Sequence, residues 1–258
     1  MKFSKRIIIG GLPRSGTTLF RYVLDASSRI ICGPETSFFL RPLTEQRKRA
    51  HWVAARVNRA LEIGEDVIIE ALARARRSVE CFDAVMTIYQ QTAGESKDIW
   101  AEKSPRNCLS YEWLYDEEPE IYFVSLIRDG RDVVTSIVEG SDEYHVTIDR
   151  YVESLEAIYR FKRGRHLVVR YEDLVCIPEP TFRKVFDFLE LDFEPEALQK
   201  YREQSVTRNR TKVNQPKVEQ DISVQWVGRW AAPEHAERIR NFLADDRACQ
   251  WLERTGYT

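Results

Sequence analysis

Short apolar runs alternate with amphipathic segments along the chain. The runs that predict buried strands lie at 6–9, 30–32, 98–102, 121–127 and 166–170. Apolar positions three or four residues apart predict helices at 17–26, 132–138, 151–159, 182–189 and 233–254. Because strands that alternate with helices pair in parallel, the pattern predicts an α/β fold of three layers around a central parallel sheet.

Two longer segments depart from this alternation. Residues 41–96 are charged and helical in pattern, which predicts a helical insertion. Residues 204–224 are polar without a clean period, which predicts a long loop. A length of 258 residues is enough for one large domain with its own core. We therefore expect a single domain, 1–258, that carries the insertion.

Charge and hydropathy narrow the classes of partner. The 39 basic and 41 acidic residues give a net charge of −2, which argues against a nucleic-acid-binding polycation. The early apolar run at 7–9 is too short for a membrane span or a signal peptide. The five cysteines show no close pairing, which is typical of buried thiols in a reducing compartment. A cytoplasmic protein without a membrane span or a nucleic acid partner is expected.

The loop after the first strand has the composition of a phosphate site. Gly11 and Gly16 have P-loop spacing, but Thr17 stands where an NTPase has its lysine. Glycines let the backbone approach a phosphate, and the amides at a helix start point toward it. The residues expected to bind an anion are Arg14, Ser15, Gly16, Thr17 and Thr18. A plain capped turn would not explain the charge of Arg14.

A second anion site is predicted after the fourth strand. Ser136 follows Arg128 by eight residues, about two turns into the predicted helix, so both side chains can hold one phosphate. The alternative is surface ion pairing of Arg128 and Arg131 with the neighbouring aspartates. Asp129 ends a strand as a magnesium-binding aspartate would, but arginines flank it, which favours an anion over a metal.

The segment Pro13-Arg14-Ser15-Gly16-Thr17-Thr18-Leu19 resembles the 5′-phosphosulfate loop of sulfotransferases that use 3′-phosphoadenosine-5′-phosphosulfate (PAPS). Arg128 and Ser136 match the family's 3′-phosphate motif, and the family implies a P-loop-like fold. Trp226 to Trp230 resembles the late segment that closes over the nucleotide. The resemblance adds Tyr171, Lys217, Gly228 and Arg229 to the expected nucleotide contacts.

Within the family, two residues resemble the catalytic pair of tyrosylprotein sulfotransferases. Glu35, in Cys-Gly-Pro-Glu-Thr, resembles their catalytic glutamate, and Lys103 resembles the lysine near the transferred sulfate. Arg14 would share the duty of Lys103. The alternatives are a capping role for Glu35 and an ion pair between Lys103 and Glu102. Many cytosolic relatives use a histidine base, and among the four histidines His51 and His145 stay open as alternatives.

The departures from this resemblance indicate a soluble, bacterial-type relative. The Golgi enzymes carry a transmembrane anchor, and they pair the cysteine at the position of Cys32 with one at the position of Ala101. Cys32 therefore lacks that partner here.

The resemblance implies a sulfotransferase that moves the sulfuryl group of PAPS to an acceptor hydroxyl, leaving 3′-phosphoadenosine-5′-phosphate (PAP). Protein tyrosine or another phenol is one acceptor, with a carboxylate base and no metal; a carbohydrate or small-molecule hydroxyl is the alternative. More remote alternatives are a P-loop kinase or NTPase and an inactive nucleotide-binding module. Eight arginines between 41 and 77 are suited to an acidic peptide or glycan, or form a solvated helix face.

Overall fold

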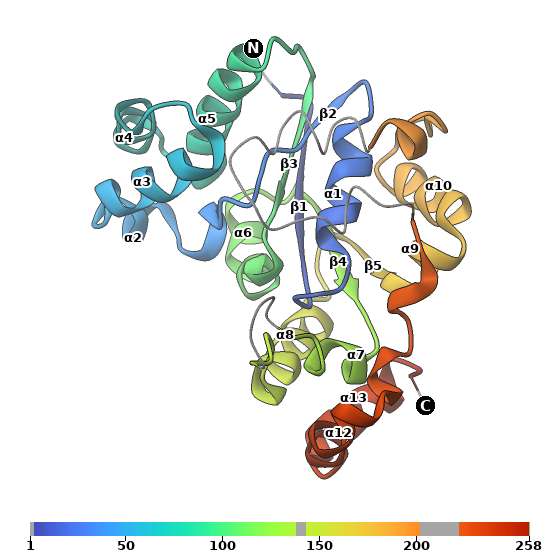
Figure 1. Cartoon of the computed structure of the whole chain (residues 1–258). Helices are drawn as coiled ribbons and strands as arrows, with labels where there is room; N and C mark the ends of the chain where they lie inside the picture. Colours follow the sequence, from blue (N-terminus) through green and yellow to red (C-terminus); the bar gives the residue numbers. More distant parts are fainter. Residues whose placement is uncertain (1–2, 138–142, 202–221, 258) are drawn as a thin grey trace.

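Five parallel strands form the centre of the molecule. The structure is a computed structural model that describes residues 3–137, 143–201 and 222–257. The strands are β1 (Lys5–Gly11), β2 (Ile30–Ile31), β3 (Ile99–Lys103), β4 (Tyr122–Ile127) and β5 (Arg165–Arg170). Their order across the sheet is β2-β3-β1-β4-β5, so β1 is the central strand (Figure 1). All four pairings are parallel, which confirms the predicted α/β class.

Helices cover both faces of the sheet. Successive side chains of β1 point to opposite faces, so its apolar residues leave an apolar surface on each side that helices must cover. Ile7 and Ile9 belong to one apolar core and Ile8 to the other. The first core is covered by α1 (Thr17–Asp25), α9 (Tyr171–Cys176) and α10 (Pro178–Phe188). The second is covered mainly by α5 (Ser78–Thr92), α6 (Tyr111–Glu117) and α8 (Ile148–Arg160). The predicted three layers are therefore present.

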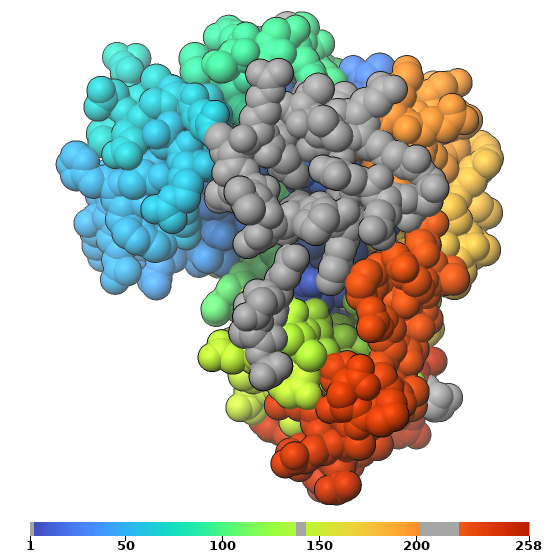
Figure 2. Space-filling view, viewed as in Figure 1, coloured from blue at the N-terminus to red at the C-terminus, as the bar shows by residue number. Residues whose placement is uncertain are grey.

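Further helices extend the second face. Within the predicted insertion lie α2 (Leu43–Arg47), α3 (Ala50–Leu61) and α4 (Glu65–Arg74), which precede α5. The C-terminal helices α12 (Ala236–Leu243) and α13 (Asp246–Arg254) pack beside α8 at the opposite end of the molecule (Figure 2). The short 3-10 helices are η1 (Phe38–Leu40), η2 (Pro105–Ser110), η3 (Val224–Trp226), η4 (Arg229–Ala231) and η5 (Pro233–His235).

The helix predicted at 132–138 is wrong in its extent. Helix α7 covers only Gly130–Val134, so Ser136 lies beyond its end rather than two turns into it. The hydroxyl of Thr135 donates to the Arg131 carbonyl at 2.7 Å, and Ile137 then pairs with Tyr144 in an antiparallel bridge. β-Branched residues favour extended backbone over helix, which explains the early exit.

The expectation that the cysteines are buried thiols is confirmed only in part. Cys32, Cys81 and Cys108 are buried, whereas Cys176 is exposed. Burial raises the pKa of the Cys108 thiol to about 11 and that of Cys81 to about 12. Among the described residues, the helices are too short or too polar to cross a bilayer.

Gly11, at the end of β1, lies very close to the backbone of β4. Gly11 pairs with Leu126 and has φ +128°, and an added Cβ would lie 2.2 Å from the Leu126 carbonyl oxygen. Gly94 also has a positive φ, +68°, but nothing lies within 4 Å of its Cβ position. Of these two glycines, Gly11 combines a left-handed backbone with a backbone clash, whereas Gly94 has the left-handed backbone alone.

Alanine at these two glycines should separate conformational strain from steric clash. We expect Gly94→Ala to cost about 1–2 kcal/mol of unfolding free energy, as a left-handed alanine does. Gly11→Ala should cost at least twice as much, because β1 and β4 must move apart. Urea unfolding of both variants measures the two costs, and equal losses would contradict the close approach at Gly11.

Candidate active site

The loop from β1 to α1 presents backbone amides at the carboxyl end of the sheet. Gly16, at the start of α1, is left-handed with φ 78°, and no described side chain caps the helix there. The Ser15 hydroxyl points inward, donating to the Leu12 carbonyl at 2.5 Å, so only the Ser15 amide remains for a ligand. Thr17 and Thr18 begin the helix. The loop therefore offers the uncapped amides of a nine-residue helix to an anion.

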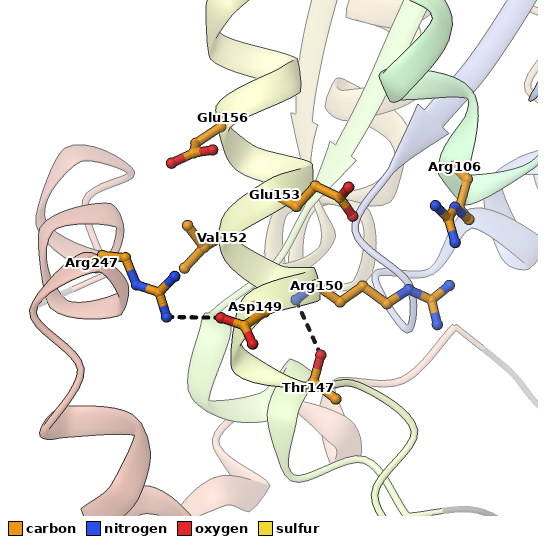
Figure 3. Close-up of a pocket in the computed structure, with 8 residues that line it drawn as sticks. All are labelled: Arg106, Thr147, Asp149, Arg150, Val152, Glu153, Glu156 and Arg247. Carbon is orange, nitrogen blue, oxygen red and sulfur yellow. Dashed lines mark hydrogen bonds and ion pairs between the residues drawn. The ribbon is translucent and has the colours of Figure 1, made fainter.

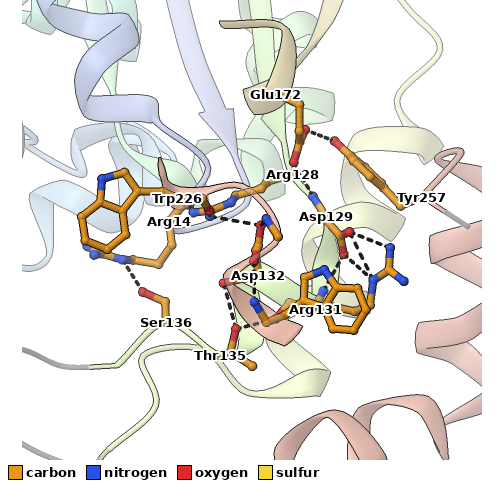
Figure 4. Close-up of polar contacts among 12 residues, drawn as sticks. Arg14, Arg128, Asp129, Arg131, Asp132, Thr135, Ser136, Glu172, Trp226 and Tyr257 are labelled. Carbon is orange, nitrogen blue, oxygen red and sulfur yellow. Dashed lines mark hydrogen bonds and ion pairs between the residues drawn. The ribbon is translucent and has the colours of Figure 1, made fainter. Parts of the chain in front are cut away.

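Three of the predicted anion-binding residues meet beside this loop. Nε of Arg14 donates to the Ser136 hydroxyl at 2.8 Å, and Nη1 of Arg128 donates to the Arg14 carbonyl at 2.9 Å. Figure 4 shows Arg14 and Arg128 converging from separate loops, with Trp226 beside them. Arg128 also donates to the Trp226 carbonyl. The loop after β1 and the segment after β4 thus form one cationic cluster.

Arg128 is held tightly but has one donor to spare. Its side chain is 10% exposed, lies 4.4 Å from the ring centre of Tyr171, and forms an ion pair with Asp132 at 3.3 Å. Its Nε is buried and has no hydrogen-bond partner among the described residues. The alternative prediction is surface ion pairing of Arg128 and Arg131 with the neighbouring aspartates, and both ion pairs are present. Because the Asp132 side chain is only 1% exposed, however, the pair with Arg128 is buried rather than a solvated surface contact. An unpaired buried N–H is costly, and a bound anion would satisfy it.

Tyr171 links this cluster to the first loop. It is buried at the start of α9, and burial raises the pKa of its phenol. An added Cβ on Gly16 would lie 2.6 Å from the Tyr171 ring, so the ring packs directly on the loop. Tyr171 therefore packs against both Gly16 and the guanidinium of Arg128.

The segment around Gly228 is anchored to α7 through Asp132. The amides of Gly228 and Trp230 donate to the two carboxylate oxygens of Asp132 at 2.9 and 3.0 Å. Arg229 stacks over Trp226 at 4.7 Å. Gly228 and Arg229 thus lie next to the Arg128 cluster, whereas Lys217 is outside the described residues.

Glu35 and Lys103 form a second cluster at the same edge of the sheet. Nζ of Lys103 lies 2.8 Å from Oε2 of Glu35, and their side chains are 5% and 45% exposed. Lys103 pairs in the sheet register with Ile9, two residues before Gly11, where β1 ends. The pair therefore lies at the strand end that also carries the first loop.

The sequence predicts Glu102 only as an alternative ion-pair partner of Lys103. In the structure its buried carboxylate instead accepts hydrogen bonds from Thr36, Ser104 and Asn107. The signal that the sequence analysis missed is an acidic residue inside the otherwise apolar run Ile-Trp-Ala-Glu. An acid at such a position needs dedicated donors.

The histidines differ in their relation to the site. Burial lowers the pKa of His166 to about 4, and its ring contacts the Ser125 hydroxyl at 2.9 Å within the sheet. His51 is exposed on α3, whereas the amide of His145 donates to the Ser136 carbonyl at 2.9 Å. Of the two histidines left open by the sequence, His145 therefore lies beside the anion cluster.

The arginine-rich helices are in part structural. Arg47 donates to the carbonyl of Leu72 and Arg77 pairs with Glu80 and Glu118, so these charges serve packing. Arg56 differs, because its guanidinium donates to the Ser37 carbonyl at 2.6 Å, two residues from Glu35. Burial lowers the pKa of Arg56. The insertion therefore reaches the candidate site through Arg56.

A hollow of about 470 Å³ lies against α8 (Figure 3). Its lining contains Arg106 and Arg150 but also Glu153 and Glu156, and Arg247 is paired with Asp149 at 2.8 Å. None of the predicted site residues lines it. This mixed charge does not select an anion, so the hollow is not assigned to the donor nucleotide. Within the described ranges, no three potential metal ligands gather.

Comparisons with known proteins show which family the chain is similar to. The sequence model of the Sulfotransferase family matches residues 6–195. Protein-tyrosine sulfotransferase A of Caenorhabditis elegans is 30% identical over 97% of this chain and 67% of its own length. The protein-tyrosine sulfotransferase of Drosophila melanogaster is 28% identical over 74% of this chain, but the match spans only 39% of that relative.

Solved structures show the same fold. The sulfotransferase domain of the Synechococcus PCC 7002 olefin synthase superposes with a TM-score of 0.66 at 19% identity, covering 95% of this chain and 97% of that one. Mouse sulfotransferase SULT7A1, solved in complex with PAP, superposes with a TM-score of 0.52 at 13% identity, covering 98% and 90%. With a family match over most of its length, the chain belongs to the sulfotransferase family.

Proposed function

We propose that the chain transfers the sulfuryl group of PAPS to an acceptor hydroxyl, with a phenol such as protein tyrosine as the first candidate. The observation that carries this proposal is the meeting of Arg14, Arg128 and Ser136 beside uncapped helix amides. Two relatives support the proposal. One is named protein-tyrosine sulfotransferase, which favours a tyrosine acceptor, and a structural neighbour was solved in complex with PAP, which favours PAPS as the donor.

The residues present fit a doubly phosphorylated nucleotide. The amides from Ser15 to Thr18, with Arg14, would hold the 5′-phosphosulfate, because they surround the start of α1. Arg128 and Ser136 would hold the 3′-phosphate, for which the unpaired Nε of Arg128 is a donor. Tyr171, Gly228 and Arg229 complete the enclosure, and Lys217 remains a predicted contact.

The pair at the end of β3 supplies the groups that sulfuryl transfer needs. Glu35 would take the proton of the acceptor hydroxyl as its oxygen bonds to sulfur. Lys103 and Arg14 would meet the negative charge that grows on the bridging oxygen as the old sulfur–oxygen bond breaks. Lys103 carries three N–H donors, so it can keep its bond to Glu35 and still reach the leaving oxygen.

The alternative acceptor group is the hydroxyl of a sugar or of another small molecule. We expect the molecule that carries the hydroxyl to be acidic, either a peptide or a glycan. Arg56 favours an acidic acceptor, because its half-buried guanidinium bonds the Ser37 carbonyl, two residues from Glu35, and forms no direct ion pair within the described ranges. Transfer to a tyrosine peptide with acidic flanks, compared with transfer to a uronic-acid oligosaccharide, distinguishes the two.

Nucleotide class is tested by thermal stabilisation. A ligand that binds only the folded chain raises Tm by mass action, by about 2.7 kcal/mol of stability at a hundredfold excess over Kd. We expect PAP without metal to raise Tm by several degrees and ATP with magnesium to leave it unchanged. The reverse result would identify an NTPase.

Substitution of Arg128 tests the 3′-phosphate site. Arg128→Ala should weaken PAP binding at least a hundredfold, because two charge-assisted hydrogen bonds are worth about 3–6 kcal/mol. Binding of AMP, which lacks the 3′-phosphate, should weaken much less, by the indirect effect of Arg128 on the first loop alone. Isothermal titration gives both constants, with Arg163→Ala as a control because Arg163 pairs with Glu112 and Asp116 at the surface. Equal losses for PAP and AMP would refute the assignment.

Substitution of Glu35 tests the base. Glu35→Ala and Glu35→Gln should lower kcat by about 10²–10⁴, the usual worth of a general base. The affinity for PAP should stay within twofold, since the anion cluster is separate. Glu45→Gln, on α2 and paired with Lys48, is the matched surface control. Turnover that survives Glu35→Ala would remove Glu35 as the base and leave His145 to be tested.

A further inference from the structure

A buried carboxylate lies behind the Glu35–Lys103 pair. Oε1 of Glu102 accepts from the Thr36 amide at 3.2 Å, the Thr36 hydroxyl at 2.7 Å and the Ser104 hydroxyl at 2.7 Å. Its Oε2 accepts from Nδ2 of Asn107 at 2.5 Å. All four residues are at most 2% exposed. Glu102 thus joins the residue after Glu35 to the residue after Lys103.

The same network also reaches β1. The Ser104 hydroxyl accepts from the Ser37 amide at 2.8 Å, while the Ser104 amide donates to the Ile9 carbonyl at 3.1 Å. Nδ2 of Asn107 donates to that carbonyl as well, at 3.1 Å. Ser37 has φ 50°, an uncommon conformation for a residue with a side chain, which persists only where surrounding contacts hold it. The network therefore fixes the loop that carries Glu35 against two strand ends.

An ionised carboxylate matches the donors at the centre of this network. Four donors converge on its two oxygens, and an ionised carboxylate is acceptor-only. A glutamine would place an NH₂ group against at least one donor. Asn107 could present its Oδ1 by turning its amide, but it would then lose the bond to the Ile9 carbonyl. Adjacent strand residues point to opposite faces, so Glu102 can serve this network while Lys103 pairs with Glu35.

We propose that Glu102 is a positioning residue for sulfuryl transfer, which holds Glu35 against Lys103 through its bonds to Thr36 and Ser104. This inference rests on the proposed function, in which Glu35 and Lys103 act on the reacting atoms. A misplacement of about 1 Å at a reacting group can lower a rate about a hundredfold. Loss of the Glu102 charge should therefore lower kcat more than it affects the binding of either substrate.

Glu102→Gln is the direct test, assayed with PAPS and an acidic tyrosine peptide. We expect kcat to fall about 10- to 100-fold, with both KM values within threefold. Asp83→Asn is the control for lost stability, because Asp83 is a partly buried carboxylate that bonds Arg6 and Trp100 away from Glu35. It should lower Tm and leave kcat unchanged. A loss of kcat no larger than that of the control would overturn the proposal.

A double-mutant cycle shows whether Glu102 acts through Glu35. In a Glu35→Ala background, Glu102→Gln should lower the residual kcat less than threefold, because coupled residues are not additive. A full further loss would mean that Glu102 does not work through the base. If Glu102→Gln fails to fold, Thr36→Val removes one of the donors with little change in shape. Its kcat should fall about fivefold, the net worth of a typical intramolecular hydrogen bond.

Hydrogen exchange separates this inference from the proposed function. The amides of Thr36 and Ser37 should exchange about tenfold faster in Glu102→Gln, while the amides of β1 and β4 keep their protection. If the wild-type chain transfers no sulfate to the peptide, the proposed acceptor fails, yet exchange still reports on Glu102. Unchanged exchange at Thr36 and Ser37 would overturn its positioning role.

Discussion

The register of one buried strand sets the positions of both halves of the candidate site. In β1, Ile9 pairs with Lys103 of β3 and Gly11 pairs with Leu126 of β4. The first loop, Lys103 and Arg128 therefore all leave the sheet at its carboxyl edge, where α/β folds bind ligands. Ile7, Ile8 and Ile9 are fully buried, with side chains in two different cores. A shift of one residue would exchange these cores, so the hydrophobic pattern of β1 holds the charged residues in place.

Charges at this edge are buried only where other loops supply their partners. Arg128 is neutralised by Asp132 and bonded to carbonyls of two other segments, and Glu102 receives four hydrogen bonds. A buried charge with an incomplete set of partners is strongly destabilising. The loops therefore depend on one another. Asp132, which neutralises Arg128, also accepts a hydrogen bond from the Gly228 amide and so anchors the segment around Gly228. This explains how Arg14 and Ser136, 122 positions apart, come into hydrogen-bond contact.

The sequence predicted what depends on local pattern and missed what depends on tertiary contact. Alternating apolar runs were enough for the five strands, and the glycine spacing was enough for the loop at Gly16. The helix through Ser136 was wrong because the bridge between Ile137 and Tyr144 competes with it. The two donors that Thr36 directs at Glu102 likewise come from a distant segment, which spacing along the chain does not reveal.

The two halves of the site differ in how they are built. The residues proposed for the nucleotide lie at the carboxyl edge of the sheet, where Arg128 is 10% exposed. Glu35 is 45% exposed and lies on a loop that the helical insertion also contacts, through the bond from Arg56 to the Ser37 carbonyl. Arg56 in turn stacks on Trp52, which is 55% exposed. The insertion also holds this loop through Gln46 of α2, which donates to the Phe38 carbonyl at 3.1 Å. The helical insertion therefore supports the Glu35 loop from one side, and the sheet edge supports it from the other through Glu102.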